Sequence, residues 1–161
     1  MAQATANPYR MEGVISNIGV NTQNNVQLHV DVEEPNGNMN SFNSNAVNLV
    51  GAPNPANDTA ATTVNFSPSN MGVYNFSFWA TSDSFPTTDT MTMSSIVTDS
   101  VYGVDYDWNN DGANLGGGYY LGRTCGGQVL ANVFDIYENT QLTSISFHVS
   151  SSSVPGAKLN V

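Results

Sequence analysis

The chain has 161 residues, of which 13 are acidic and 3 are basic, giving a formal net charge of −10. This balance argues against nucleic-acid binding, which draws on clusters of Lys and Arg. No apolar run approaches the roughly 20 residues that a membrane helix needs, so we expect no insertion into a bilayer. Hydrophobic residues make up 40% of the chain, enough for a folded core. Solubility must rest mainly on Asn, Ser, Thr and Gly, which suits an extracellular or outer cell-surface location.

Short alternating runs recur between turn-forming clusters, and helical periodicity does not appear, which predicts an all-β protein. In the second run, Val26, Leu28, Val30 and Val32 are expected to point inward. Asn36-Gly37 then suits the positive φ of a hairpin turn. Strands or strand-like segments are expected at residues 9–18, 26–32, 41–50 (one or two short strands), 62–66, 74–80 and 90–97. Roughly seven short strands in about a hundred residues is the count typical of a sandwich.

The segment 66–90 carries a turn, a strand and a loop in immunoglobulin-like order. Asn70-Met71-Gly72 makes the turn, and period-two spacing places Tyr74, Phe76 and Phe78 on one face of the strand. An Asn-x-Gly-x-Tyr run before an inward-facing strand resembles the tyrosine corner of immunoglobulin-like sandwiches, whose hydroxyl hydrogen-bonds to the preceding backbone. Trp79 points to the opposite face, where it either packs under a loop or provides a platform on which a sugar ring can stack.

The sequence changes character after residue 97, and we place a domain boundary near Ser100, separating residues 1–99 from residues 100–161. Residues 127–136 and 141–149 are expected to form strands of a second β unit, and residues 158–161 begin another. About sixty residues with so few strands make a thin sandwich. This unit is either truncated or completed by a strand from elsewhere.

Three segments carry a resemblance to a known family: GVISNIG at 13–19, QNNV at 23–26 and the tyrosine-corner region at 66–89. Their order resembles CARDB-type immunoglobulin-like modules in secreted proteins of Bacteroidetes. The linker at 97–103 and the VFDI run at 133–136 are similar to proteins in which a jelly-roll-like β domain follows. Such proteins commonly carry a type IX secretion sorting domain further on. The resemblance implies export and a multidomain parent protein, and it implies no catalysis.

The run Asp107-Trp108-Asn109-Asn110-Asp111-Gly112 matches the D-x-N-x-D-G opening of a calcium loop. Gly118 occupies the position of the bidentate Glu, so a remote carboxylate such as Asp135 or Glu138 would have to replace it. The alternative is an Asn/Asp-rich turn between domains that binds no metal. The candidate calcium ligands are Asp105, Asp107, Asn109 and Asp111.

Aromatic residues flank the glycine run that follows, and they form a candidate carbohydrate-facing cluster if the second unit is a lectin-like jelly roll. These candidate ligand-binding residues are Trp108, Tyr119 and Tyr120. The single Cys125 is expected to be a buried, unreactive thiol. His29 and His148 have no base or nucleophile near them in sequence, so we expect both to be ordinary surface histidines. No catalytic residues are predicted.

Three functions follow as hypotheses. The first is a non-catalytic spacer and adhesive or assembly module of a secreted or cell-surface bacterial protein, with recognition in the loops at the sandwich ends. The second is a carbohydrate-binding accessory domain of a secreted hydrolase, with or without dependence on calcium. The third is a fibre subunit that assembles with copies of itself by strand exchange. An enzyme is not expected.

Overall fold

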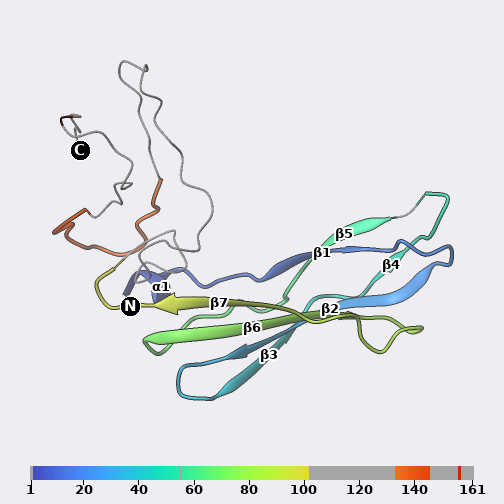
Figure 1. Cartoon of the computed structure of the whole chain (residues 1–161), viewed down its shortest axis with the longest axis horizontal. Helices are drawn as coiled ribbons and strands as arrows, with labels where there is room; N and C mark the ends of the chain where they lie inside the picture. The colour runs from blue at the N-terminus through green and yellow to red at the C-terminus, as the bar shows by residue number, and fades with distance from the viewer. Residues whose placement is uncertain (1, 55, 102–132, 146–155, 157–161) are drawn as a thin grey trace.

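The computed structural model describes residues 2–54, 56–101, 133–145 and 156. Within these residues the protein is nearly all β, as predicted, although a short helix that the sequence pattern did not indicate opens the chain (Figure 1). In chain order the elements are α1 (Ala2–Ala6), β1 (Glu12–Ser16), β2 (Gln23–Glu33), β3 (Met39–Asn43), β4 (Val47–Leu49), β5 (Asn57–Ala61), β6 (Gly72–Thr81) and β7 (Met91–Val97).

The strands form two antiparallel sheets of unequal size (Figure 1). The larger sheet has the order β3-β2-β6-β7, and β4 pairs with the first residues of β2. The smaller sheet contains only β1 and β5 among the described residues. The two inner faces enclose the core, so the all-β sandwich predicted from the sequence is confirmed.

The long central strand β2 follows the predicted alternation. Its four inward residues are buried, and Val30 and Val32 have no exposed surface. The register of β2 against β6 sets Val30 opposite Phe78 and Val32 opposite Phe76, so the apolar residues of both strands share the inner face. A slip of one residue would turn every one of these side chains to solvent, which fixes the pairing.

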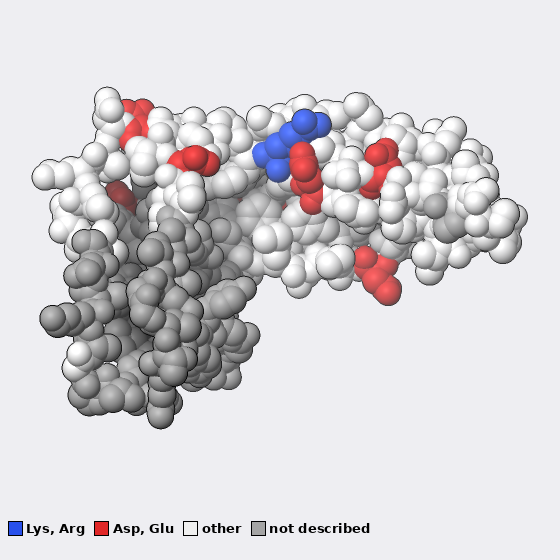
Figure 2. All heavy atoms as spheres, turned by 90° about the horizontal axis from the view of Figure 1, so that it is seen from above, with Lys and Arg blue, Asp and Glu red and all other residues white. Residues whose placement is uncertain are grey.

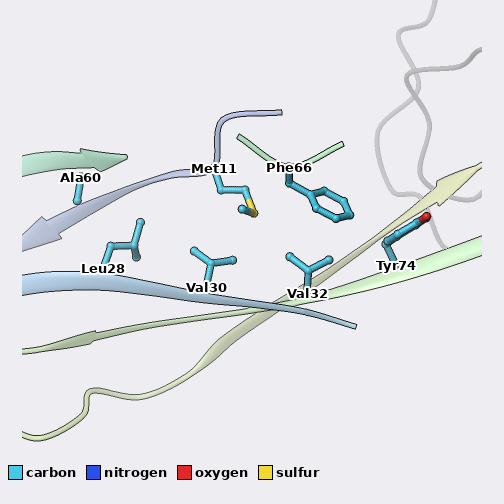
Figure 3. Packing of buried hydrophobic residues seen from close by; sticks show 7 residues of the cluster. All are labelled: Met11, Leu28, Val30, Val32, Ala60, Phe66 and Tyr74. Atoms are coloured by element: carbon cyan, nitrogen blue, oxygen red, sulfur yellow. The ribbon is translucent and has the colours of Figure 1, made fainter. Parts of the chain in front are cut away.

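Buried residues from both sheets meet in one cluster (Figure 3). The side chains of Val30 and Val32 point from β2 toward Met11 and Phe66, which belong to the opposite layer. Outside the named strands, Phe66 and Tyr9 form an isolated antiparallel β-bridge. The cluster consists of Met11, Leu28, Val30, Val32, Ala60, Phe66 and Tyr74.

The predicted tyrosine corner is present. The Tyr74 hydroxyl donates a hydrogen bond to the carbonyl of Asn70 at 2.8 Å and accepts one from the Asn70 amide at 2.9 Å. Gly72 adopts a φ of 129°, and a Cβ at this position would lie 2.7 Å from the Cβ of Pro35. The turn therefore needs glycine for its backbone angle and for its contact.

The predicted Asn-Gly hairpin turn between β2 and β3 is confirmed. Gly37 has a φ of 84°, its amide donates to the carbonyl of Glu34, and the amide of Glu34 donates to the carbonyl of Asn38. Two neighbouring boundaries differ from the prediction. Strand β5 begins at Asn57, where no strand was expected, and residues 62–66 form only isolated bridges at Thr62 and Phe66. The reason is that the partner residues set where pairing occurs, and local composition does not. These partners lie in segment 9–16 for β5 and Phe66, and Ser44 is the partner of Thr62.

Strand β7 could present either of two faces to the core, and its register decides between them. Met91 lies opposite Phe78 and Met93 opposite Phe76, so the methionines are on the inner face of the sheet. They are nevertheless 75% and 55% exposed. No described strand of the smaller sheet covers this part of β7, whereas Val97 at its other end packs against the core.

The described part of the expected second unit contains no strand. Residues 133–136 and 141–145 were expected within strands, but residues 133–145 have no regular secondary structure. Alternation alone does not make a strand, because a ladder also needs a partner strand at hydrogen-bonding distance. The remaining residues of these two predicted strands, and residues 158–161, lie outside the described residues.

Candidate recognition surface at the loop end

The chain enters and leaves the sandwich at one end, and three loops gather at the other (Figure 1). Tyr9, just before β1, bridges to Phe66, and Val97, at the end of β7, lies opposite Gly72. Phe66 belongs to the connection that precedes β6 and Gly72 is the first residue of β6, so the two chain ends of the sandwich lie together. We name the opposite end the loop end. It consists of the described residues 17–22, 50–54, 56 and 82–90.

A buried asparagine ties the first loop to the second. The Asn17 side-chain amide donates to the carbonyls of Asn21 and Leu49, each at 2.9 Å, and its Oδ1 accepts from the amide of Gly19 at 3.0 Å. The side chain is only 7% exposed, and all of its polar atoms are used. A buried amide with its hydrogen bonds made holds both loops in one arrangement.

The second loop also packs directly against the first. The amide of Ala52 donates to the carbonyl of Gly19 at 2.8 Å. Gly51 is buried so tightly that a Cβ there would lie 2.5 Å from the carbonyl carbon of Val20 and 2.7 Å from the oxygen of Gly19. Two backbones approach this closely only where a side chain is missing.

The third loop is tied to the start of β2. Asn25, with a φ of 53°, donates from its side-chain amide to both carboxylate oxygens of Asp83 at 3.0 and 2.9 Å. The amide of Asp83 donates to the carbonyl of Asn24, and the Ser82 hydroxyl donates to Oε1 of Gln23. The left-handed conformation of Asn25 falls where the pairing of β2 with β4 shifts register. Asparagine tolerates this conformation better than most residues.

The hydrogen-bonded frame presents apolar side chains to solvent. Ile18 is 92% exposed, Val20 75%, Phe85 57% and Val50 55%. The loops carry few charges, and Figure 2 shows none of its red or blue atoms at the right-hand extremity, where the loop end lies. Apolar side chains on a fixed backbone, in loops whose charged residues are Asp83 and Asp89 alone, are suited to contact another apolar surface.

A second surface with chemical content is the outward face of the larger sheet. The rings of His29 and Trp79 stack with their centroids 5.5 Å apart and an interplanar angle of 13°. Nε2 of His29 also lies 2.9 Å from the Thr81 hydroxyl. Both residues face away from the core, as predicted. Trp79 is half-buried, and its described ring partner is the neighbouring His29, not a residue of a covering loop.

Polar side chains continue across this outward face. The Ser41 hydroxyl donates to Asp31 at 2.6 Å. Further along, the side-chain amide of Asn75 donates to Glu33, and the Ser94 hydroxyl donates to Oδ1 of Asn75. The face therefore combines one aromatic pair with a row of carboxylate, amide and hydroxyl groups.

The sites predicted from the sequence lie outside the described residues. These are the calcium ligands Asp105, Asp107, Asn109 and Asp111, the aromatic cluster Trp108, Tyr119 and Tyr120, and also Cys125 and His148. The two remote carboxylates are described. Asp135 accepts a hydrogen bond from the Tyr137 hydroxyl, and Glu138 accepts one from the amide of Asn139. Within the part of the chain that the structure describes, no three His, Cys, Asp or Glu residues group as metal ligands would.

Comparison of the chain with protein-family models, with curated proteins and with solved structures finds no match. Over residues 2–54, 56–101 and 133–145, no helix has the length and hydropathy to cross a membrane.

The sequence interpretation missed the residues of the loop end. Its signal was nevertheless present in part, because Val20 and Phe85 are apolar residues placed within turn-forming clusters, outside any expected strand. Ile18 is the last residue of the expected strand 9–18. Apolar residues in a turn have no core face to occupy, so they are candidates for contact with a partner.

Proposed function

We propose that this chain is a non-catalytic structural and adhesive module of a secreted or cell-surface bacterial protein, built as an immunoglobulin-like sandwich and recognising its partner through the loop end. One observation carries the proposal. Ile18, Val20 and Val50 are exposed on loops that hydrogen bonds through Asn17 hold in place. Phe85 is exposed on the third loop, which the hydrogen bonds from Asn25 to Asp83 hold. A fixed backbone lowers the entropy that a loop loses on binding, so these exposed side chains can contribute to affinity.

The position of the chain ends supports an interaction role more than a spacer role. A spacer in series would receive the chain at one end and release it at the other. Here both connections lie at the end opposite the loops (Figure 1). The sandwich thus projects from the path of the parent chain, with the loop end as its outermost part.

The test is an adhesion assay under flow. Beads coated with the full chain are passed over glass coated with mucin, with collagen or with polyethylene glycol. Each apolar side chain that becomes fully buried contributes about 1.5–3 kcal/mol, so even partial burial of three should matter. We expect Ile18→Ser, Val20→Ser and Phe85→Ser together to reduce retention on mucin or collagen by about tenfold.

A matched control places the same kind of change elsewhere. Val64→Ser and Val73→Ser alter residues that are 62% and 47% exposed but lie outside the loop end. Retention of this control should equal that of the unmodified chain. Equal losses in both variants, or native beads held no better on either protein than on polyethylene glycol, would contradict the proposal.

A carbohydrate-binding role is the second candidate, and the stacked His29–Trp79 pair favours it. Aromatic rings beside carboxylate, amide and hydroxyl groups offer both stacking and hydrogen bonding to a sugar. Affinity electrophoresis in gels containing xylan or laminarin would test it. We expect Trp79→Ala to abolish retardation, whereas the loop-end triple variant should still be retarded. If a chelator removes the retardation and calcium restores it, the proposed calcium loop takes part in carbohydrate binding. If neither polysaccharide changes the mobility of the chain, the carbohydrate-binding role is contradicted.

A further inference from the structure

The two sheets of the sandwich do not match in width. The larger one contains β7, but the smaller one has only two described strands, and no described strand covers the methionines of β7. Met91 and Met93 lie on the inner face of the sheet at 75% and 55% exposure. Inner-face apolar residues of a sandwich are normally covered, so this part of the interior lacks a covering element among the described residues.

The same strand has an open backbone edge. Among the described residues, β7 pairs with β6 alone. Its seven residues, MTMSSIV, include no charged residue, no proline and no glycine. Natural edge strands are usually protected by such residues, because an open edge accepts another strand. The other sheet shows the contrast, since Glu12, the first residue of β1, forms an ion pair at 3.9 Å with Arg10.

We propose that the β7 edge binds an extended segment of a different protein chain, with an uncharged centre that alternates apolar and small polar residues and with Lys or Arg at its ends. Backbone hydrogen bonds along β7 would supply affinity, and the apolar side chains of the segment would cover Met91 and Met93. This is recognition by strand addition. Apart from Asp89, which belongs to both, it uses a surface separate from the loop end.

Charge selects this occupant over a second copy of the chain. Asp89 and Asp99 flank β7 on its two sides. In an antiparallel pair of β7 strands with Ser94 opposite Ser94, Asp89 of each copy lies opposite Asp99 of the other, so carboxylates repel at both ends. Each copy also carries a net charge of −10. The same two carboxylates attract basic residues at the ends of an incoming segment.

No segment of the sequence has this charge pattern. Its three basic residues are Arg10, Arg123 and Lys158, and no two of them enclose a short alternating run. The proposed partner is therefore another protein, and the charge pattern of its strand identifies it.

The experiment uses the full chain and a fluorescent peptide in which valine and threonine alternate between terminal lysines. A matched peptide has terminal aspartates instead. Fluorescence anisotropy should show binding of the lysine peptide, with the aspartate peptide weaker by about tenfold because exposed ion pairs contribute modestly. Amide hydrogen exchange of β7 should slow when the lysine peptide is added.

Two variants with the same substitution locate the contact. Met93→Lys places a charge on the inner face of β7 and should weaken the lysine peptide by at least about tenfold. Met39→Lys, at a residue that is 59% exposed on β3, should leave binding unchanged. Thermal melts of both variants verify that they remain folded. The loop-end triple variant should bind the peptide normally, so failure of one proposal does not imply failure of the other.

Three results would overturn the assignment. If the two peptides bind with equal affinity, Asp89 and Asp99 do not select a segment with basic ends. A concentration-dependent dimer that Met93→Lys abolishes would identify a second copy as the occupant. Slow exchange of the β7 amides in the monomeric chain without peptide would mean that the chain fills this edge itself.

Discussion

Replacing Phe66 with alanine should lower the free energy of unfolding by about 3–5 kcal/mol. The side chain is 6% exposed and lies at the centre of the aromatic core. Its ring makes edge contacts with Phe42, Tyr74 and Phe76, with centroid separations of 5.8, 5.6 and 6.4 Å. Alanine would leave a cavity between the two layers and would remove three aromatic pairs at once. Such a loss is a large share of the stability of a typical domain.

Urea-induced unfolding, followed by circular dichroism, measures this effect as a lower midpoint at an unchanged slope. The matched control is Phe85→Ala, the same substitution at a residue that is 57% exposed in the loop end. We expect the control to change stability by less than about 0.5 kcal/mol. Similar midpoints for the two variants would show that the core does not centre on Phe66.

Gly51→Ala should destabilise the sandwich by about 3 kcal/mol, the upper part of the range for overpacking. The added methyl would lie 2.5 Å from the carbonyl carbon of Val20. Since this neighbour is backbone, no side-chain rotation can relieve the overlap. The two loops must move apart, which would also break the hydrogen bond from Ala52 to Gly19.

The control for this substitution is Gly13→Ala. A Cβ at Gly13 would meet the side chain of Leu28 at 3.5 Å, which is ordinary van der Waals contact. We expect little change in stability there, because the extra methyl fits and restricts the unfolded chain. Retention of Gly51→Ala beads in the adhesion assay should also fall, because the substitution disturbs the frame of the loop end. An unfolding midpoint equal to that of the native chain would contradict the close packing of these loops.

Local patterns in the sequence were sufficient to predict the strands that form the larger sheet. Val30 and Val32 alternate with polar residues that face solvent, and Tyr74 follows its turn at the spacing of a tyrosine corner. Both patterns depend on residues close together in the chain, so they were predictable. The inner and outer faces of β2 and β6 were therefore correct before the structure was known.

Features that depend on distant residues were not predictable. Asn25 meets Asp83 across 58 positions, and Asn17 reaches Leu49 across 32. No local periodicity encodes such contacts, and they are what assemble the loop end. The same limit explains residues 133–145, where alternation indicated strands but the structure has none. Pairing depends on a partner that composition does not reveal.

The position of the chain ends has a mechanical consequence. Tension on the residues before Tyr9 and after Val97 would act at a single end of the sandwich, on strands that belong to different sheets. Such a force peels β1 from β5 and β7 from β6 one rung at a time, because it does not shear a whole ladder at once. Few hydrogen bonds resist at any moment, so the unit would yield at low force.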